Sequence, residues 1–238
     1  MSAPRLHVVA PLAAGGSVAV EGERVHYLRN VLRLRDGAEV RAFHAGDGEW
    51  RCRIGGGGRH RVELRVDERL RAPTPEPGPT LAFAPIRRNR LEWLVEKAVE
   101  LGAAALVPVL TARTVVRPGN ADRLEAIAVE AAEQCERLTV PGVAAPAALD
   151  AWLAGRDPAV PLLFAEERGQ GVPVLDAVRG RADVVLLVGP EGGFTPEELD
   201  RLHAARGSRA VSLGPLILRA ETAALVALAA WRLAQTDA

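Results

Sequence analysis

The pattern of hydrophobic and polar positions changes near residues 71–79 of the chain. Before this point, five short segments alternate apolar and polar residues, and glycine-rich turns such as Gly46-Asp47-Gly48 separate them. Alternation with a period of two is typical of half-buried strands, and strands at this spacing predict a small antiparallel barrel. The predicted strands cover residues 6–9, 17–20, 39–44, 49–54 and 61–66.

A helical period interrupts these strands at residues 26–33, HYLRNVLR. On a helix, Arg29 and Arg33 would lie four residues apart on one face. Two interpretations stay open. The arginine pair grips an RNA backbone, or it is the solvated face of a helix that plugs the barrel.

Residues 71–79, RAPTPEPGP, contain four prolines and one glycine, a composition typical of a linker. They separate two predicted domains, residues 1–72 and 79–238. Beyond the linker, strands predicted at residues 80–84, 104–110, 160–164, 184–188 and 209–213 alternate with helices predicted at 89–101, 121–136, 147–154, 196–206 and 219–234. This alternation predicts an α/β domain with a mostly parallel sheet covered on both faces, preceded by a small all-β domain.

Residues 184–198, VVLLVGPEGGFTPEE, combine a buried strand, a glycine loop and a helix start. Thr195 is the expected N-cap, and Glu198 closes a capping box. Open α/β sheets bind ligands where strands end and helices begin. The loop has no lysine or hydroxyl residue and carries Glu191, which disfavours a polyphosphate and suits a neutral or cationic ligand. An ordinary strand-to-helix turn remains the alternative.

Charge, cysteine content and hydropathy indicate which ligands and which cellular location to expect. The 30 basic and 30 acidic residues balance, but the first 72 residues hold 13 arginines against 9 acidic residues. This modest excess is compatible with phosphate contacts or with a plain solvated surface. Cys52 and Cys135 lack the spacing of metal ligands, so we expect reduced thiols and no metal. No apolar run reaches membrane-spanning length and no signal peptide is evident, so we expect a soluble, cytoplasmic protein without membrane contact.

Five segments, in order, resemble the RsmE-type ribosomal RNA methyltransferases of the SPOUT superfamily: residues 26–33 (HYLRNVLR), 96–102 (EKAVELG), 132–137 (AEQCER), 189–193 (GPEGG) and 213–223 (LGPLILRAETA). The resemblance implies a PUA-like barrel that engages RNA and an α/β domain tied in a C-terminal trefoil knot. It also implies a homodimer that uses S-adenosylmethionine to methylate N3 of a uridine in the 16S rRNA decoding region of the small ribosomal subunit, U1498 in the family.

The resemblance also assigns roles to residues. Backbone groups of small and aliphatic residues would hold the donor, and the expected set is Phe164, Ala165, Glu166, Gly189, Pro190, Glu191, Gly192, Leu213, Gly214, Ile217 and Leu218. From the chemistry of methyl transfer, our own hypothesis is that Arg219 orients the uracil or stabilises the growing oxygen charge, with Glu221 or Glu133 as base or orienting group. Glu221 has a second interpretation, since a carboxylate in a first helical turn often only complements the helix dipole. The expected RNA contacts are Arg5, Arg29, Arg33, Arg113, Gln134 and Arg137.

The chain departs from the family pattern at Leu216, where an arginine is common, and at Arg87 or Arg88, which replaces a lysine. The first departure puts one substrate contact in doubt. Two other functions remain open. The chain could be a SPOUT methyltransferase acting on another RNA, such as a tRNA ribose 2′-hydroxyl, or a non-catalytic RNA-binding protein.

Overall fold

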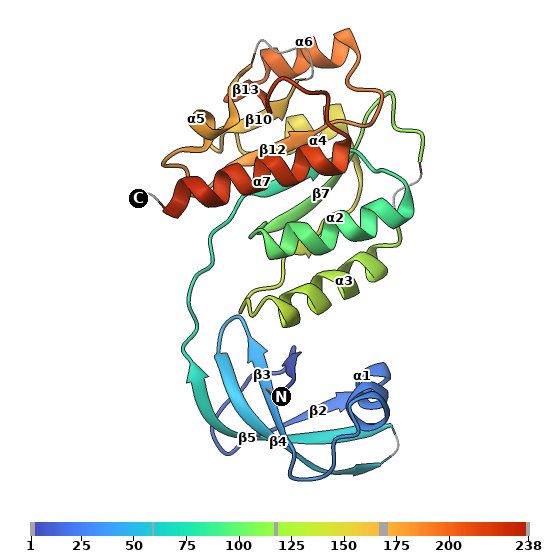
Figure 1. Ribbon diagram of the computed structural model, residues 1–238, viewed down its shortest axis with the longest axis vertical. Helices are drawn as coiled ribbons and strands as arrows, with labels where there is room; N and C mark the ends of the chain where they lie inside the picture. Colours follow the sequence, from blue (N-terminus) through green and yellow to red (C-terminus); the bar gives the residue numbers. More distant parts are fainter. Residues whose placement is uncertain (1–2, 59, 117–118, 167–170, 237–238) are drawn as a thin grey trace. The chain divides into compact units, whose positions relative to one another are not determined.

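A computed structural model of the chain describes residues 3–58, 60–116, 119–166 and 171–236 (Figure 1). The chain forms two compact units. The first, here named the β unit, comprises Met1–Pro75 and Ala132–Val140, and the second, the α/β unit, comprises Glu76–Ala131 and Pro141–Ala238. The segment Ala132–Val140 therefore belongs to the first unit, although the sequence alone assigned it to the second domain.

The β unit is built on a five-stranded sheet in the order β1-β3-β4-β5-β2. The alternating sequence pattern explains how one face of this sheet is buried. In β2, Val18 and Val20 are buried while their neighbours along the strand are exposed. β1 pairs in parallel with β3, whereas the other pairs are antiparallel as predicted. The strands are β1 (Arg5–His7), β2 (Ser17–Glu21), β3 (Glu39–His44), β4 (Gly48–Gly58) and β5 (Arg61–Arg71).

The predicted helix at residues 26–33 is shorter and less regular than expected. It consists of α1 (Glu23–His26) and a π-helical segment (Tyr27–Val31). Arg33 lies beyond both, with a φ of 56°, so the prediction that Arg29 and Arg33 share one helical face is wrong. Val25 and Leu28 are buried in the core of the β unit, which favours the plug interpretation of this segment.

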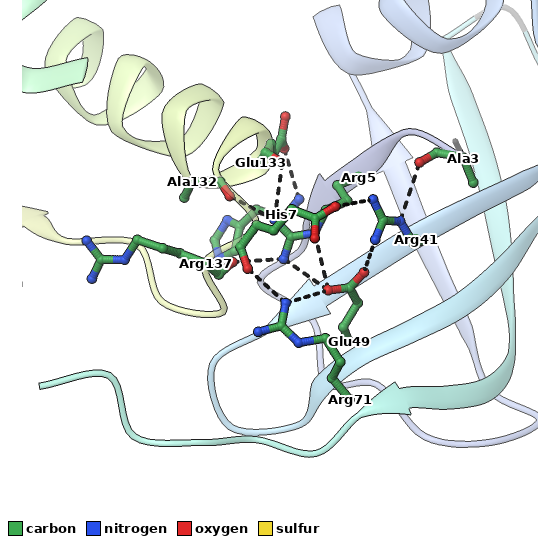
Figure 2. A network of polar contacts seen from close by, with 10 residues as sticks. Ala3, Arg5, His7, Arg41, Glu49, Arg71, Ala132, Glu133 and Arg137 are labelled. Carbon is green, nitrogen blue, oxygen red and sulfur yellow. Dashed lines mark hydrogen bonds and ion pairs between the residues drawn. The ribbon is translucent and has the colours of Figure 1, made fainter. Parts of the chain in front are cut away.

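A cluster of ion pairs holds Ala132–Val140 within the β unit (Figure 2). Arg5 pairs with the buried Glu49 and donates through Nη1 to Ala132 O at 2.8 Å and through Nη2 to Arg137 O at 2.8 Å. Glu49 also pairs with Arg41 at 3.1 Å and Arg71 at 3.2 Å. We expected Arg5 to contact an RNA backbone. It is only 6% exposed, so it holds this segment instead.

The α/β unit is built on a parallel sheet in the order β11-β13-β10-β12-β6-β7-β8, with β9 paired to β7. Its strands are β6 (Thr80–Phe83), β7 (Ala105–Leu110), β8 (Gly142–Val143), β9 (Ala147–Ala148), β10 (Leu162–Ala165), β11 (Val172–Pro173), β12 (Val185–Val188) and β13 (Ser208–Ser212). Its helices are α2 (Arg88–Glu100), α3 (Ala121–Gln134, whose last residues enter the β unit), α4 (Leu149–Gly155), α5 (Val174–Val178), α6 (Pro196–Ala204) and α7 (Ala220–Thr236). The predicted parallel sheet is confirmed.

The central strand and the last helix organise the α/β unit. All four residues of β12 are buried, as the uninterrupted apolar run predicted. α7 packs against α2, α5 and β12, while α6 packs against β13 (Figure 1). The trefoil knot stays a prediction. Within the described residues, no helix combines the length and apolar character needed to cross a membrane.

Candidate functional site

A cavity of about 330 Å³ lies in the α/β unit where β10, β12 and β13 end. This edge of a parallel sheet is the usual place for a ligand. Three segments that follow these strands supply its walls, together with one residue that follows β7. The lining residues are Arg113, Ala165, Glu166, Val188, Gly189, Pro190, Glu191, Gly192, Gly193, Phe194, Pro196, Leu199, Leu213, Gly214, Leu216, Ile217, Leu218, Ala220 and Ala223.

The first wall is the glycine loop between β12 and α6. A Cβ atom at Gly189 would lie 3.0 Å from the ring of Phe194, which also lines the cavity. Gly193 donates its N–H to Pro190 O at 2.9 Å and has a φ of 67°. Both positions therefore favour glycine, one because of a close approach and the other because of its conformation.

The start of α6 confirms the predicted capping box. Glu198 N–H donates to Thr195 Oγ1, and Thr195 N–H donates to Glu198 Oε2 at 2.9 Å. The pKa of Glu197 lies below its ordinary value because its own backbone N–H and the Thr195 hydroxyl donate to the carboxylate, with smaller contributions from the charges of Arg201 and Arg113.

The second wall, between β13 and α7, presents apolar side chains to the cavity. Leu216 is 76% exposed and Ile217 is 81% exposed, although both line it. Gly214 has a φ of 112°, which a residue with a side chain rarely adopts. This wall therefore offers aliphatic surface and backbone groups.

Two carboxylates give the cavity its charge character. Glu166 and Glu191 line it, and Arg113 is the one basic residue among the described lining residues. His203 Nε2 lies 3.4 Å from Glu166 Oε2, and its ring packs edge-on against Phe164 with centroids 5.0 Å apart. His203 comes from α6, and no sequence motif marked it.

Most residues expected to hold a donor meet at this cavity. Phe164 is the exception, because its side chain is fully buried in the core. Phe164 is also absent from the residues that line the cavity. The lining residues from the predicted set are Ala165, Glu166, Gly189, Pro190, Glu191, Gly192, Leu213, Gly214, Ile217 and Leu218.

The polar residues at the start of α7 have contrasting environments. Arg219 is exposed, and within the described part of the chain its guanidinium has no hydrogen bond or ion pair. Glu221 is buried, and its Oε1 accepts from Arg90 Nη1 at 2.9 Å. Glu221 Oε2 is buried and has no hydrogen-bond partner among the described residues. The pairing with Arg90 crosses 131 residues of sequence, and no local pattern indicated it.

The remaining predicted residues belong to the β unit. Glu133 Oε1 accepts from His7 N–H at 2.9 Å and lies 3.9 Å from Arg24 Nη2, so its carboxylate stabilises the position of β1. Gln134 is exposed, and Arg137 Nη2 donates to Thr139 Oγ1 at 3.0 Å. Two further predicted RNA contacts, Arg29 and Arg33, have different environments. Arg29 is paired with Asp36, whereas the side chain of Arg33 is exposed.

No group of three or more His, Cys, Asp or Glu side chains within the described ranges is arranged to hold a metal ion. The cavity instead combines backbone groups, aliphatic side chains and two carboxylates. Such a set suits an organic ligand that is uncharged or positively charged, and its volume is in the range of small-molecule sites.

Comparison with known proteins places the chain among RNA methyltransferases. The family described as an RNA methyltransferase domain matches residues 74–232, and that described as an RNA methyltransferase PUA domain matches residues 20–67. A ribosomal RNA small subunit methyltransferase E from Rickettsia conorii is 33% identical over 96% of this chain and 95% of its own length. The Bacillus subtilis protein of that name is 31% identical over 89% of this chain and 88% of its own length. A crystal structure of the Neisseria gonorrhoeae protein of that name, bound to S-adenosyl methionine, is similar at a TM-score of 0.88 and 30% identity, covering 98% of each chain.

Proposed function

Because the chain belongs to the family of ribosomal RNA small subunit methyltransferase E, we propose that it methylates the 16S rRNA of the small ribosomal subunit. The methyl donor in this proposal is S-adenosylmethionine. The acceptor is N3 of a uridine in the decoding region, and the sequence resemblance gives its family position as U1498.

The cavity of the α/β unit is the observation that carries this proposal. S-adenosylmethionine has a sulfonium, an ammonium group and ribose hydroxyls, and it has no phosphate. Carboxylates at Glu166 and Glu191 suit the cationic groups, while the glycine loop exposes backbone that can accept from hydroxyls. Leu213, Ile217 and Leu218 offer apolar surface for the adenine ring. The residues present therefore fit this donor.

Once bound, S-adenosylmethionine supplies an already activated methyl group. The chain's residues must therefore orient the uracil and help the N3 proton to leave. We assign the first task to Arg219, because its exposed guanidinium has no partner among the described residues. Glu221 is the proposed proton acceptor or orienting group, since its buried Oε2 has no hydrogen-bond partner among the described residues.

We also propose that the protein is a cytoplasmic homodimer. The support for the homodimer comes from α7, which buries one face within the α/β unit and leaves a second apolar stripe partly exposed. Leu233 is 64% exposed in this stripe. The stripe contains the partly or fully exposed residues Leu225, Val226, Ala229, Ala230 and Leu233. An apolar face of this kind on a helix is usually covered, and the molar mass in solution tests whether a second copy covers it.

The test is methylation of defined RNA by the purified protein with isotope-labelled S-adenosylmethionine. Free 16S rRNA and isolated small subunits serve as separate substrates, and tRNA is the comparison substrate. We expect 3-methyluridine after nuclease digestion and mass spectrometry of the rRNA, at one position that reverse transcription maps. A ribose 2′-O-methyl product, or transfer to tRNA alone, would replace this proposal with that of another RNA methyltransferase.

A further inference from the structure

Hydrogen bonds connect the glycine loop and the start of α6 to a turn that follows a different strand. This turn, Thr111 to Thr114, comes directly after β7. The carboxylate of Glu198, which is 2% exposed, reaches it from α6. Glu198 Oε1 accepts from Ala112 N–H at 2.7 Å, while its Oε2 accepts from Thr195 N–H in the capping box. One buried carboxylate thus joins the turn to the end of the glycine loop.

Arg113 also joins these segments, but here the side chain comes from the turn and reaches the glycine loop. Its Nη1 donates to Gly192 O at 2.6 Å and to Phe194 O at 3.2 Å. Its aliphatic stem also lies along the loop, because a Cβ atom at Gly192 would be 3.4 Å from Arg113 Cδ. The loop therefore donates to the carboxylate of α6 and accepts from the guanidinium of the turn.

The turn itself is held in shape before it meets the loop. Thr111 N–H donates to Thr114 Oγ1 at 3.0 Å, and Thr114 N–H donates to Thr111 O at 3.0 Å. The two hydroxyl oxygens are 2.9 Å apart, and Thr111 is only 8% exposed. A turn with three internal hydrogen bonds can present Ala112 and Arg113 with little loss of entropy on pairing.

We propose that Arg113 is a positioning residue for the donor pocket, acting with Glu198 to fix the glycine loop, and that it is not an RNA contact. Its Nη1 is engaged with two loop carbonyls, so a phosphate would have to share this exposed guanidinium with the loop. Donor binding to a loop that is already ordered costs less conformational entropy than binding to a mobile loop. The identity of the donor as S-adenosylmethionine rests on the proposed function, while the loop fixation does not.

The main experiment compares Arg113→Ala and Arg113→Lys with Arg179→Ala. Arg179 is an exposed arginine directly after α5 that pairs with Asp176 and lies outside the pocket lining, which makes it a matched control. We expect Arg113→Ala to weaken S-adenosylmethionine binding in calorimetry by about tenfold, since a charged donor to two carbonyls is lost. KM for the donor should rise in proportion, while kcat at saturating donor stays within about twofold. Arg113→Lys should recover part of the affinity, because an ammonium reaches one carbonyl more easily than two.

Hydrogen exchange of the ligand-free protein gives a readout that does not depend on the reaction. The backbone amides of Gly189 and of residues 191–195 should exchange faster in Arg113→Ala and in Glu198→Gln than in the parent or in Arg179→Ala. Unchanged exchange together with unchanged donor affinity would overturn the proposal. So would a variant whose only defect is weaker RNA binding with a flatter salt dependence, because that is the behaviour of a phosphate contact. If the parent protein bound no S-adenosylmethionine, the proposed function would fail, and hydrogen exchange would still decide the role of Arg113.

Discussion

Arg219 and Glu221 stand two residues apart at the start of α7, yet only the arginine is exposed. Its guanidinium can therefore meet a substrate without breaking a contact within the described residues. We expect Arg219→Ala to lower the methylation rate by about a hundredfold or more, because a charge-stabilising donor is lost. Donor affinity should be unchanged. Single-turnover methylation and calorimetry measure the two quantities.

Arg232→Ala is the control for this substitution. Arg232 is exposed near the other end of α7, and its Nη1 donates to Glu100 O at 3.1 Å. It should retain turnover within about twofold, as is usual for surface substitutions. Near-normal turnover by Arg219→Ala would remove Arg219 from the mechanism.

His7 makes the stability of the β unit depend on pH. Burial, with the nearby charges of Arg24 and His44, lowers the pKa of His7 to about 4 from an ordinary 6.5. Between these values the unfolded chain binds a proton that the folded ring does not. The contribution of neutral His7 is therefore complete above about pH 6.5 and is lost as the pH falls toward 4.

We expect acidification across this range to destabilise the parent more than His7→Gln. The difference should be about 1–2 kcal/mol, less than the full shift would give because the ring is partly exposed to solvent. Urea unfolding at both ends of the range measures it, and carboxylate titration cancels between the two proteins. Parallel losses of stability in parent and variant would contradict this role for His7.

At the scale of single residues, the sequence predicted the pocket better than the arginines. The expected pocket positions came from motifs shared with the family, and all of them except Phe164 line the cavity, while their role in donor binding stays a prediction. Arg5 and Arg113 look like surface arginines in the sequence, but both donate to backbone carbonyls of segments far away in the chain. Long-range acceptors of this kind leave no local pattern, so neither these contacts nor the burial of Arg5 could be foreseen from residue type.

At the scale of elements, the glycine loop depends on close packing between its two ends. Gly189→Ala should weaken donor binding by more than about tenfold, because its new Cβ would lie 3.0 Å from the Phe194 ring, which must then move within the cavity wall. Gly142→Ala is the matched control, since a Cβ atom there meets nothing within 4 Å. Calorimetry with S-adenosylmethionine and the melting temperature separate a local from a global effect. Equal affinities of the two variants would show that the loop adapts.

The sheet of the β unit depends on the ion pairs of Glu49, which is 1% exposed and paired with three arginines. Glu49→Gln leaves Arg5 buried without a carboxylate, and we expect a loss of about 3–5 kcal/mol in the free energy of unfolding. Asp67→Asn removes the partner of Arg53 in a half-exposed pair and should cost less than about 1 kcal/mol. Urea unfolding compares them, and similar losses would mean that the Glu49 cluster adds little.

Elements with a long periodic pattern were predictable, whereas short or irregular ones were not. The buried run of β12 and the capped start of α6 were evident because several signals agreed there. The strands β8, β9 and β11 have two residues each, too few for any period to show. The π-helical turn at Tyr27–Val31 shares its residue types with an α-helix, so the position of Arg33 could not be predicted.

At the scale of the whole molecule, charge is balanced in total and uneven in distribution. The first 72 residues hold four more arginines than acidic residues. We expect RNA affinity to fall steeply with salt concentration, as it does when phosphates are neutralised. Arg33→Ala should flatten the logarithmic salt slope by about one, because Arg33 is exposed. Arg5→Lys should leave the slope unchanged, since the substitution keeps the positive charge and Arg5 is buried. Filter binding across a salt series measures both, and a salt-independent affinity would exclude backbone contacts by this surface.

The division of the chain was partly visible in the sequence. Four prolines in nine residues indicated the linker, because proline and glycine interrupt regular elements. The sequence did not indicate that Ala132–Val140 belongs to the β unit. Arg5 holds this segment through backbone carbonyl groups, which every residue has.

The place of Ala132–Val140 in the β unit has a consequence for gene fusion and domain shuffling. Cutting after residue 75 gives a fragment with all five strands, but it would carry Arg5 without the carbonyls of Ala132 and Arg137. A buried guanidinium stripped of its acceptors is strongly destabilising. The β unit is therefore not a portable module that recombination can move as one contiguous stretch. Any chimera that keeps it folded must inherit residues 132–140 as well, so the two units are expected to be inherited together.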